Sequence, residues 1–255
     1  MWRKISNGIS ALYTIIVLYF VLYTGLSLAW LIPGVLFFIG VYSWGVFDIR
    51  LGFFIPAIVK SPNPKPKTIA LTFDDGPTPY TLQVLDLLGR YQAKATFFCI
   101  GKQIEQYPDI AKRILAEGHT LGNHSYSHPK SMGFLSTAEV KTEIEKCTAV
   151  MQQILQFQTP FYRPPFGITN PHIAKAIRQT QHRVIGWNNR SLDTVIEDEN
   201  TIFNRVYKRI DEQSLVLLHD TSKRSVKALE ILLKQLQQEK YKMVNLVEFL
   251  NEEKQ

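Results

Sequence analysis

Charged residues are missing from a long stretch near the start of this 255-residue chain. Residues 9–47 contain no aspartate, glutamate, lysine, arginine or histidine, and they are rich in leucine, isoleucine, valine, phenylalanine and tyrosine. A helix of about 20 such residues crosses the hydrocarbon core of a bilayer. The stretch is too long for an ordinary helix in the core of a soluble domain, so it indicates an N-terminal membrane segment.

The same stretch lacks the features of a cleaved signal peptide. A signal peptide has a short apolar region and a cleavage site of small residues, whereas this region is long and aromatic with no such site behind it. One span would leave nearly half the stretch unexplained. Two short spans would use all of it, with residues 31–34 at or near the reversal. The second span would then be about fifteen residues long, and could instead be re-entrant or interfacial.

The orientation of this segment is left open by the sequence. Arg3 and Lys4 favour a cytoplasmic N-terminus. One span would then carry the rest of the chain outside, whereas two spans would return it to the cytoplasm. Arg50 and Lys60, which follow the apolar stretch, lean weakly toward the inside.

Cysteines and long basic runs are also scarce. Cys99 and Cys147 have no disulfide or metal-binding spacing, and Cys99 lies in an apolar run typical of a buried structural thiol. The net charge is +7, but the basic residues are scattered over predicted helices. A nucleic-acid partner is therefore not expected, whereas an anionic membrane or wall polymer is compatible with the charge.

Prolines mark the boundary between the membrane segment and the rest of the chain. Three of them alternate with polar residues just after residue 60, which favours a stiff extended segment. We therefore predict a membrane anchor of one or two transmembrane helices with its connector over residues 1–60, a Pro-rich linker over 61–66, and a folded domain over 67–255.

Strand and helix patterns alternate through the folded domain. Apolar runs predict strands at residues 68–73, 95–100, 120–122, 161–163, 183–187, 215–219 and 242–246. Amphipathic patterns predict helices at residues 81–91, 103–117, 137–155, 171–181, 201–212 and 225–239, with a short helix behind the last strand. About seven β/α units imply a parallel sheet covered by helices. Because no G-x-G-x-x-G turn supports a dinucleotide fold, we predict a closed or nearly closed barrel.

Polar residues that could carry chemistry follow the predicted strands, at the catalytic end of a β/α barrel. Asp74 and Asp75 directly follow the first strand, although Gly76-Pro77 behind them also suits a simple turn. His124 and His128 follow the third strand. At this spacing they can meet on one face of a helical turn and, with one carboxylate, suit a divalent ion such as zinc. Such pairs also arise by chance on surfaces.

Three further strand ends carry candidate residues. Arg163 follows the fourth strand beside a rigid Pro164-Pro165 pair, Asp193 comes after the fifth, and His219 directly follows four apolar residues of the sixth. Each has an ordinary interpretation, as a surface residue or a histidine satisfied in the core. Their joint occurrence at successive strand ends is much harder to attribute to chance and predicts one shared site.

In order and spacing these segments resemble the motifs of the polysaccharide deacetylases, the NodB-homology or carbohydrate esterase 4 family. The resemblance covers roughly residues 66–250 and rests on TFDDGP at 72–77, HSYSH at 124–128, RPPFG at 163–167, Asp193, and LLH at 217–219. It implies an α/β fold, a distorted (β/α)7 barrel preceded here by the N-terminal hydrophobic membrane segment. It also implies one divalent metal ion, for which zinc is favoured and cobalt, nickel or manganese would fit.

The resemblance implies roles for the residues around that ion. Its ligands would be Asp75, His124 and His128, and Asp74 would be the general base, held and oriented by Arg163. A bound metal lowers the pKa of its water and polarises a carbonyl, and a neighbouring carboxylate can take the water's remaining proton.

The other matching residues would complete an amide hydrolase. His219 would be the general acid, tethered by Asp193, which suits protonation of a leaving amine. The backbone N–H of Phe166 would help form an oxyanion hole, and Leu217 would line the acetyl pocket. The implied reaction is removal of N-acetyl groups from an N-acetylglucosamine-containing polysaccharide, such as peptidoglycan, a chitin-like polymer or a surface glycan.

The sequence also departs from the family pattern. Thr194 stands where many members have Trp, Phe166 where Tyr is frequent, and Asn188 and Asn189 where an acidic residue is often found. These changes bear on acyl-group and sugar specificity more than on metal binding.

Two alternative functions stay open. One is a deacylase or deformylase of a lipid-linked sugar, which the membrane anchor suggests. The other is a glycan-binding protein that keeps the fold without turnover. We expect a domain anchored to the inner or plasma membrane and facing the periplasm or cell exterior. A cytoplasmic domain would nearly exclude mature wall polymer as substrate.

Overall fold

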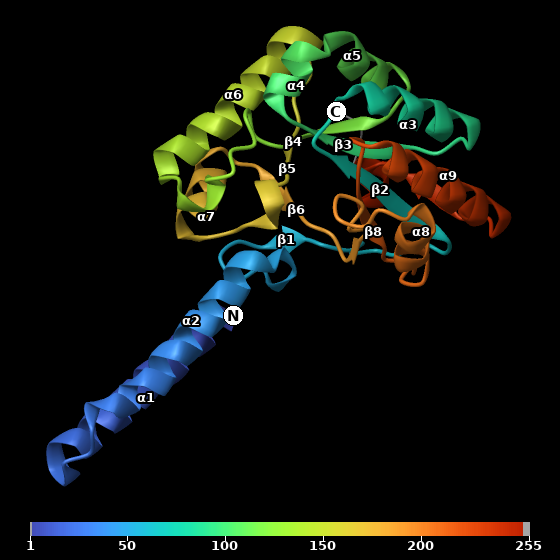
Figure 1. Ribbon diagram of the computed structural model, residues 1–255. Helices are drawn as coiled ribbons and strands as arrows, with labels where there is room; N and C mark the ends of the chain where they lie inside the picture. Colours follow the sequence, from blue (N-terminus) through green and yellow to red (C-terminus); the bar gives the residue numbers. More distant parts are fainter. Residues whose placement is uncertain (1, 252–255) are drawn as a thin grey trace.

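An N-terminal helical hairpin leads into an all-parallel sheet surrounded by helices (Figure 1). The computed structural model describes residues 2–251. The side chains of Arg3 and Lys4, on which the predicted orientation partly rests, and residues 252–255 of the predicted domain lie outside the described residues.

Short parallel strands form the sheet. In chain order they are β1 (Ala57–Ile58), β2 (Thr68–Asp74), β3 (Ala95–Cys99), β4 (Thr120–Asn123), β5 (Phe161–Tyr162), β6 (Arg183–Ile185), β7 (Asn189–Arg190), β8 (Leu215–His219) and β9 (Lys242–Val244). Their spatial order is β1-β6-β5-β4-β3-β2-β8-β7, and β9 pairs with the first residues of β2. Within residues 2–251 the edge strands β1 and β7 are not paired with each other, so the barrel is open between them. The predicted distorted (β/α)7 barrel is confirmed.

Helices connect and cover these strands. They are α1 (Trp2–Thr24), α2 (Leu31–Phe47), α3 (Pro79–Arg90), α4 (Gly101–Gln106), α5 (Pro108–Ala116), α6 (Thr137–Leu155), α7 (Pro171–Gln179), α8 (Glu199–Tyr207), α9 (Lys223–Gln238) and α10 (Leu246–Phe249), with 3-10 turns η1 (Leu28–Trp30), η2 (Ile49–Leu51), η3 (Met132–Phe134) and η4 (Pro165–Gly167). The single helix predicted over 103–117 is wrong. Tyr107 leaves the helical region with φ −129° and ψ 57°, because Pro108 disfavours helical backbone before it and starts a new helix.

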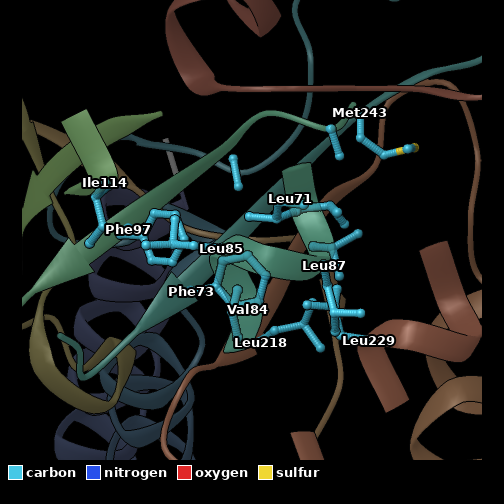
Figure 2. Close-up of a cluster of buried hydrophobic side chains, with 14 of the residues drawn as sticks. Leu71, Phe73, Val84, Leu85, Leu87, Phe97, Ile114, Leu218, Leu229 and Met243 are labelled. Carbon is cyan, nitrogen blue, oxygen red and sulfur yellow. The ribbon is translucent and has the colours of Figure 1, made fainter. Parts of the chain in front are cut away.

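β2 shows how the sheet separates core from site. All of its residues are buried, as expected for a central strand of a parallel sheet covered on both faces. Ile69, Leu71 and Phe73 belong to the main hydrophobic cluster, together with side chains of α3 and α9 (Figure 2). Side chains alternate along a strand, so Thr72 and Asp74 point the other way, into the barrel.

The helices α1 and α2 lie side by side and antiparallel (Figure 1). The chain reverses at residues 25–30, and residues 31–34, expected at or near the reversal, form the first turn of α2. Tyr13 ties the helices together, because its hydroxyl donates to the Trp30 carbonyl at 2.6 Å and its ring packs on Gly34. Both helices are long and apolar enough to cross a membrane, and only 6% of each apolar window is buried. A core helix of a soluble domain would be mostly buried.

Part of the predicted connector and linker belongs to the folded domain. Residues 53–55 are buried in a cluster with side chains of α7, and β1 pairs with β6. The Ser61 N–H donates to the Gln213 carbonyl at 3.3 Å, and the Lys67 carbonyl accepts from β9. The proline segment is therefore fixed at both ends, and the domain begins just after Phe47 in the structure. Pairing across more than a hundred residues leaves no local pattern, which is why the sequence placed this boundary later.

Candidate active site

The predicted site residues converge at the carboxyl ends of the strands. Asp74 ends β2 and His219 ends β8, and the two residues are direct neighbours in the register of these strands. Arg163 follows β5, and its backbone N–H donates to the carbonyl of Asn123 at the end of β4. The sheet therefore brings together residues that are up to 145 positions apart in the chain.

Asp75, His124 and His128 form a compact group that could hold a metal ion, with ligand atoms within 4.8 Å of one another. Asp75 Oδ1 lies 3.4 Å from Nε2 of each histidine. Two atoms about 2.1 Å from a tetrahedral zinc ion are themselves about 3.4 Å apart. This Oδ1 is also buried without a well-aligned hydrogen bond in the described residues, so an ion would satisfy it. The geometry fits a divalent metal.

A hydrogen bond to the backbone of Arg163 orients the His124 ring as a metal ligand. Its Nδ1 lies 2.7 Å from the carbonyl oxygen of Arg163, and because a carbonyl can only accept, Nδ1 carries the proton. The Nε2 lone pair therefore faces Asp75, the usual arrangement of a metal-ligating histidine. Burial tends to raise the pKa of Asp75, but the neighbouring imidazoles, His124 first and then His219 and His128, lower it overall, which favours the carboxylate.

The two histidines do not meet on a helical turn, so that part of the sequence interpretation is wrong. Residues 124–129 are irregular, and Ser125 and His128 both have left-handed backbone, with φ of 65° and 49°. The rings are brought to 4.9 Å between centroids by the turn of this loop.

The helix α6 holds the histidine loop. The Asn123 side chain donates to the Ile144 carbonyl at 2.9 Å and accepts from the Ser125 N–H at 2.9 Å. The Glu143 carboxylate accepts from the N–H and the hydroxyl of Ser127, at 2.7 and 2.8 Å. These hydrogen bonds pair the backbone N–H groups of Ser125 and Ser127 and link the loop to α6. They therefore fix the backbone that carries the two histidines.

Arg163 is fully buried and fixed on every side. Its Nη1 donates to Asp74 Oδ1 at 2.7 Å and to the Thr72 hydroxyl at 2.8 Å. Its Nε and Nη2 donate to the carbonyls of Ile185 and Gly186. A buried guanidinium requires such partners, and together they leave Asp74 one free oxygen, Oδ2, which lies 3.9 Å from His124 Nε2.

His219, at the end of β8, faces the group formed by Asp75, His124 and His128. Its imidazole Nδ1 lies 2.7 Å from Asp193 Oδ1, and its backbone N–H donates to Asp193 Oδ2 at 2.8 Å. Burial alone would lower the pKa of His219, but the hydrogen bond and charge of Asp193, with the charges of Asp74 and Asp75, raise it to about 9. His219 Nε2 points at the metal group, 3.9 Å from Asp75 Oδ2.

Phe166 and Leu217 occupy different positions in the site. Phe166 has a φ of 59°, which turns its half-exposed ring against His128 with 4.6 Å between centroids. Leu217 is buried inside the barrel in one cluster with Trp187. Next to them, Gly167 leaves no room for a side chain, because an added Cβ would overlap the Trp187 ring.

Sequence reasoning missed four supporting residues. Thr72 binds Arg163, Ser191 donates to Asp193 Oδ1 at 2.7 Å, and Glu143 and Asp220 hold loops of the site. Alternation along β2 could have indicated Thr72, and the neighbourhood of His219 could have indicated Asp220. Glu143 is one of several glutamates on α6, and nothing local distinguishes it.

Asp220 lies beneath the Asp75 loop. Its Oδ2 accepts from the Thr81 hydroxyl at 2.5 Å, and a side chain at position 76 would overlap the carboxylate, so Gly76 is the residue that fits there. Burial raises the pKa of Asp220 to about 7, against the lowering by its hydrogen bonds.

Comparisons with known proteins find relatives that match most of the chain. The family model described as polysaccharide deacetylase matches residues 61–185. The peptidoglycan-N-acetylmuramic acid deacetylase PdaC of Bacillus subtilis is 33% identical over 194 residues, which are 76% of this chain but 41% of that protein. A peptidoglycan-N-acetylglucosamine deacetylase of Bacillus cereus is 34% identical over 190 residues, which are 72% of this chain and 88% of that protein.

A solved structure also matches most of the chain. The Bc1960 peptidoglycan N-acetylglucosamine deacetylase has a TM-score of 0.72 and 31% identity, and the match covers 77% of this chain and 94% of that one. The chain spans less than half the length of PdaC, but it spans most of the other two proteins. From its fold, its ordered motifs and these matches, the chain belongs to the polysaccharide deacetylase family.

Proposed function

We propose that this protein is a membrane-anchored, metal-dependent hydrolase that removes N-acetyl groups from an N-acetylglucosamine-containing glycan. One observation carries the proposal: a buried carboxylate oxygen, Asp75 Oδ1, lies between two imidazoles at 3.4 Å. The Asp74–Arg163 pair and His219 flank this group.

Asp75, His124 and His128 would hold one divalent ion. When bound, it would lower the pKa of a water molecule and polarise the acetamide carbonyl. Zinc suits two imidazoles and one carboxylate in an open site, and cobalt, nickel or manganese also suits these ligands.

Asp74 is assigned as the general base. Arg163 occupies its Oδ1, and the free Oδ2 faces the ligand group. A carboxylate fixed in this way can accept a proton from a water molecule bound between it and the ligands. The Arg163 side chain fixes the carboxylate direction and does not need to contact substrate.

His219 is assigned as the general acid. The carboxylate of Asp193 holds its Nδ1 and stabilises the imidazolium, so Nε2 is left to give its proton to the leaving amine. The backbone N–H of Phe166 is assigned to the developing oxyanion and Leu217 to the wall of the acetyl pocket.

The departures from the family pattern bear on specificity. Asn188 and Asn189, which replace an acidic residue, bond to the backbone of residues 213–215 and of Val206. Asn188 thus ties the segment before β7 to the start of β8, and Asn189 ties β7 to α8, instead of facing the ligand group. Thr194 is exposed, so the pocket has no aromatic wall at this position.

The domain is proposed to face the periplasm or cell exterior, where peptidoglycan-like substrates lie. Because α1 and α2 are antiparallel, this places the N-terminus on the same side (Figure 1). The alternative of a lipid-linked sugar substrate is favoured by the close packing of α2 on the domain.

Acetate release by the full-length protein in detergent tests the activity. Chitooligosaccharides and peptidoglycan are assayed after metal removal and again with added zinc or cobalt, and Asp75→Asn serves as the matched control. Metal-dependent release that Asp75→Asn abolishes supports the proposal. A folded, metal-loaded protein that releases no acetate from any acetylated sugar contradicts it and favours a glycan-binding role.

A further inference from the structure

The helix α2 joins the domain without a flexible segment. Gly45 in its last turn is buried, and an added Cβ there would lie 2.6 Å from the Phe53 ring. The Tyr42 ring packs edge-on against Phe53 and Phe54, with centroids 5.6 and 5.3 Å apart. The end of the hairpin is therefore packed on the domain.

The same end of α2 contacts a loop of the candidate active site. Thr169 donates its N–H to the Val46 carbonyl at 3.0 Å and its hydroxyl to the Gly45 carbonyl at 3.4 Å. Thr169 follows closely after Phe166, whose ring centroid is 4.6 Å from that of His128. The intervening backbone spans at most roughly 11 Å. His128 therefore lies on the order of 15–20 Å from the end of the apolar helix.

Exposed aromatic side chains gather near this junction. Trp44 and Phe47 in the last turns of α2 are 61% and 70% exposed, and Phe134 in η3 is 94% exposed. η3 borders the same active-site loop, because the Asn170 side chain donates to the Gly133 carbonyl at 2.8 Å. Tryptophan is enriched at the interface between bilayer and water, and exposed phenylalanines can bury their rings at the boundary between headgroups and acyl chains.

We propose that the hairpin is a rigid mount that holds the rim of the active site beside the bilayer surface, and that the substrate is an N-acetylated sugar attached to a membrane lipid. This inference rests on the proposed anchor and deacetylase activity. The headgroup layer of one leaflet is about 5–8 Å thick, so the site lies within roughly 7–15 Å of its outer edge. The proline segment 61–66 cannot extend the reach, because both of its ends are fixed on the domain.

The height of the domain above the bilayer is measured first. Full-length Phe134→Cys and Asp109→Cys are labelled with a fluorophore and reconstituted in vesicles whose lipid headgroups carry a quencher. The two side chains are 94% and 95% exposed, but Asp109 lies on α5, at the far end of the domain from the hairpin (Figure 1). The native cysteines are buried. We expect strong quenching at position 134 and little at 109. Equal quenching at both positions overturns the mount.

A second pair of variants tests the packing of α2. Gly45→Leu would displace the Phe53 ring, whereas an added Cβ at Gly40 on the same helix meets no atom within 4 Å in the described part of the chain. We expect Gly45→Leu to remove at least half of the quenching difference between positions 134 and 109, and Gly40→Leu to preserve it. If Gly45→Leu inserts and folds but leaves the difference intact, the packing does not set the height.

Substrate preference is measured with one N-acetylated oligosaccharide in three forms: attached to a lipid in the enzyme's own vesicles, attached to a lipid in separate vesicles, and free in solution. We expect acetate release at least tenfold faster from the first form at equal total concentration. Equal rates from the first and the free form overturn the inference while the proposed activity stands. Release from none of them contradicts the proposed function, and the quenching result then tests the mount independently.

Discussion

Asp74 and Asp75 are adjacent carboxylates for which the structure predicts different consequences of mutation. Asp75 Oδ1 lies 3.4 Å from both histidine Nε2 atoms. Asp74 gives one oxygen to Arg163 and approaches His124 no closer than 3.9 Å. We expect Asp74→Asn to lose rate while it keeps metal, and Asp75→Asn to lose metal and rate together.

The magnitudes follow from these contacts. Removing a general base costs about 10²- to 10⁴-fold in rate, which corresponds to about 3–5 kcal/mol of activation free energy. An asparagine at position 74 still offers an oxygen to Arg163, but it leaves the buried guanidinium without its counter-charge. Breaking a buried pair completely costs about 3–5 kcal/mol of folding stability, and the remaining hydrogen bond should reduce that cost. Loss of a direct ligand in Asp75→Asn should weaken metal binding by more than the 10- to 100-fold typical of outer partners.

The assay combines three measurements on full-length protein in detergent. Competition with a chelator gives the affinity for zinc or cobalt, acetate release gives kcat and KM, and thermal unfolding shows that each variant is folded. The reasoning is refuted if folded Asp74→Asn loses metal affinity as strongly as Asp75→Asn. It is equally refuted if metal-loaded Asp74→Asn keeps its rate within about threefold of the original protein.

Three further predictions follow from other contacts. Asp193→Asn removes the charge that raises the pKa of His219 to about 9, so the alkaline limb of the kcat profile should move to lower pH; an unmoved limb would contradict the tether. Burial and nearby cations lower the pKa of His119 to about 4, below the unfolded value of about 6.5. The original protein should therefore lose up to about 3 kcal/mol of stability as pH falls from 6.5 to 4. His119→Asn, which keeps an acceptor for the same backbone N–H, should flatten that part of the unfolding curve, and an identical pH dependence would refute the assignment. Glu143→Ala should weaken metal binding about 10- to 100-fold by loosening the histidine loop, whereas exposed Glu145→Ala on the same helix should not; equal effects would show that the loop bonds are unimportant.

Much of the fold could be predicted from local pattern. Strands such as β2 and β8 are continuous apolar runs followed at once by polar residues, so their ends are visible in the sequence. The candidate residues Asp74 and His219 were predicted because each stands at such a point, and the register of β2 and β8 then makes them neighbours. Pro108, by contrast, interrupts the helix predicted over 103–117 and starts α5, although the apolar periodicity runs across it.

Other features depend on partners that are distant in the chain. The strand β1 has two residues and forms because β6 offers an edge more than a hundred residues later. Glu143 becomes part of the site only when α6 packs beside the histidine loop. Local periodicity contains no information about such pairings.

The sequence by itself determined the membrane-length apolar stretch, the alternation of strands and helices, and the family motifs, since each is written in neighbouring residues. Only the tertiary structure decided how His124 and His128 meet, because left-handed backbone and bonds to α6 shape their loop. It also decided that the chain after Phe47 packs directly on the domain. That packing is stabilised by burial of Phe53 and Phe54 against side chains of α7 and β6. Because these partners are more than a hundred residues away in the chain, no local sequence pattern predicts it.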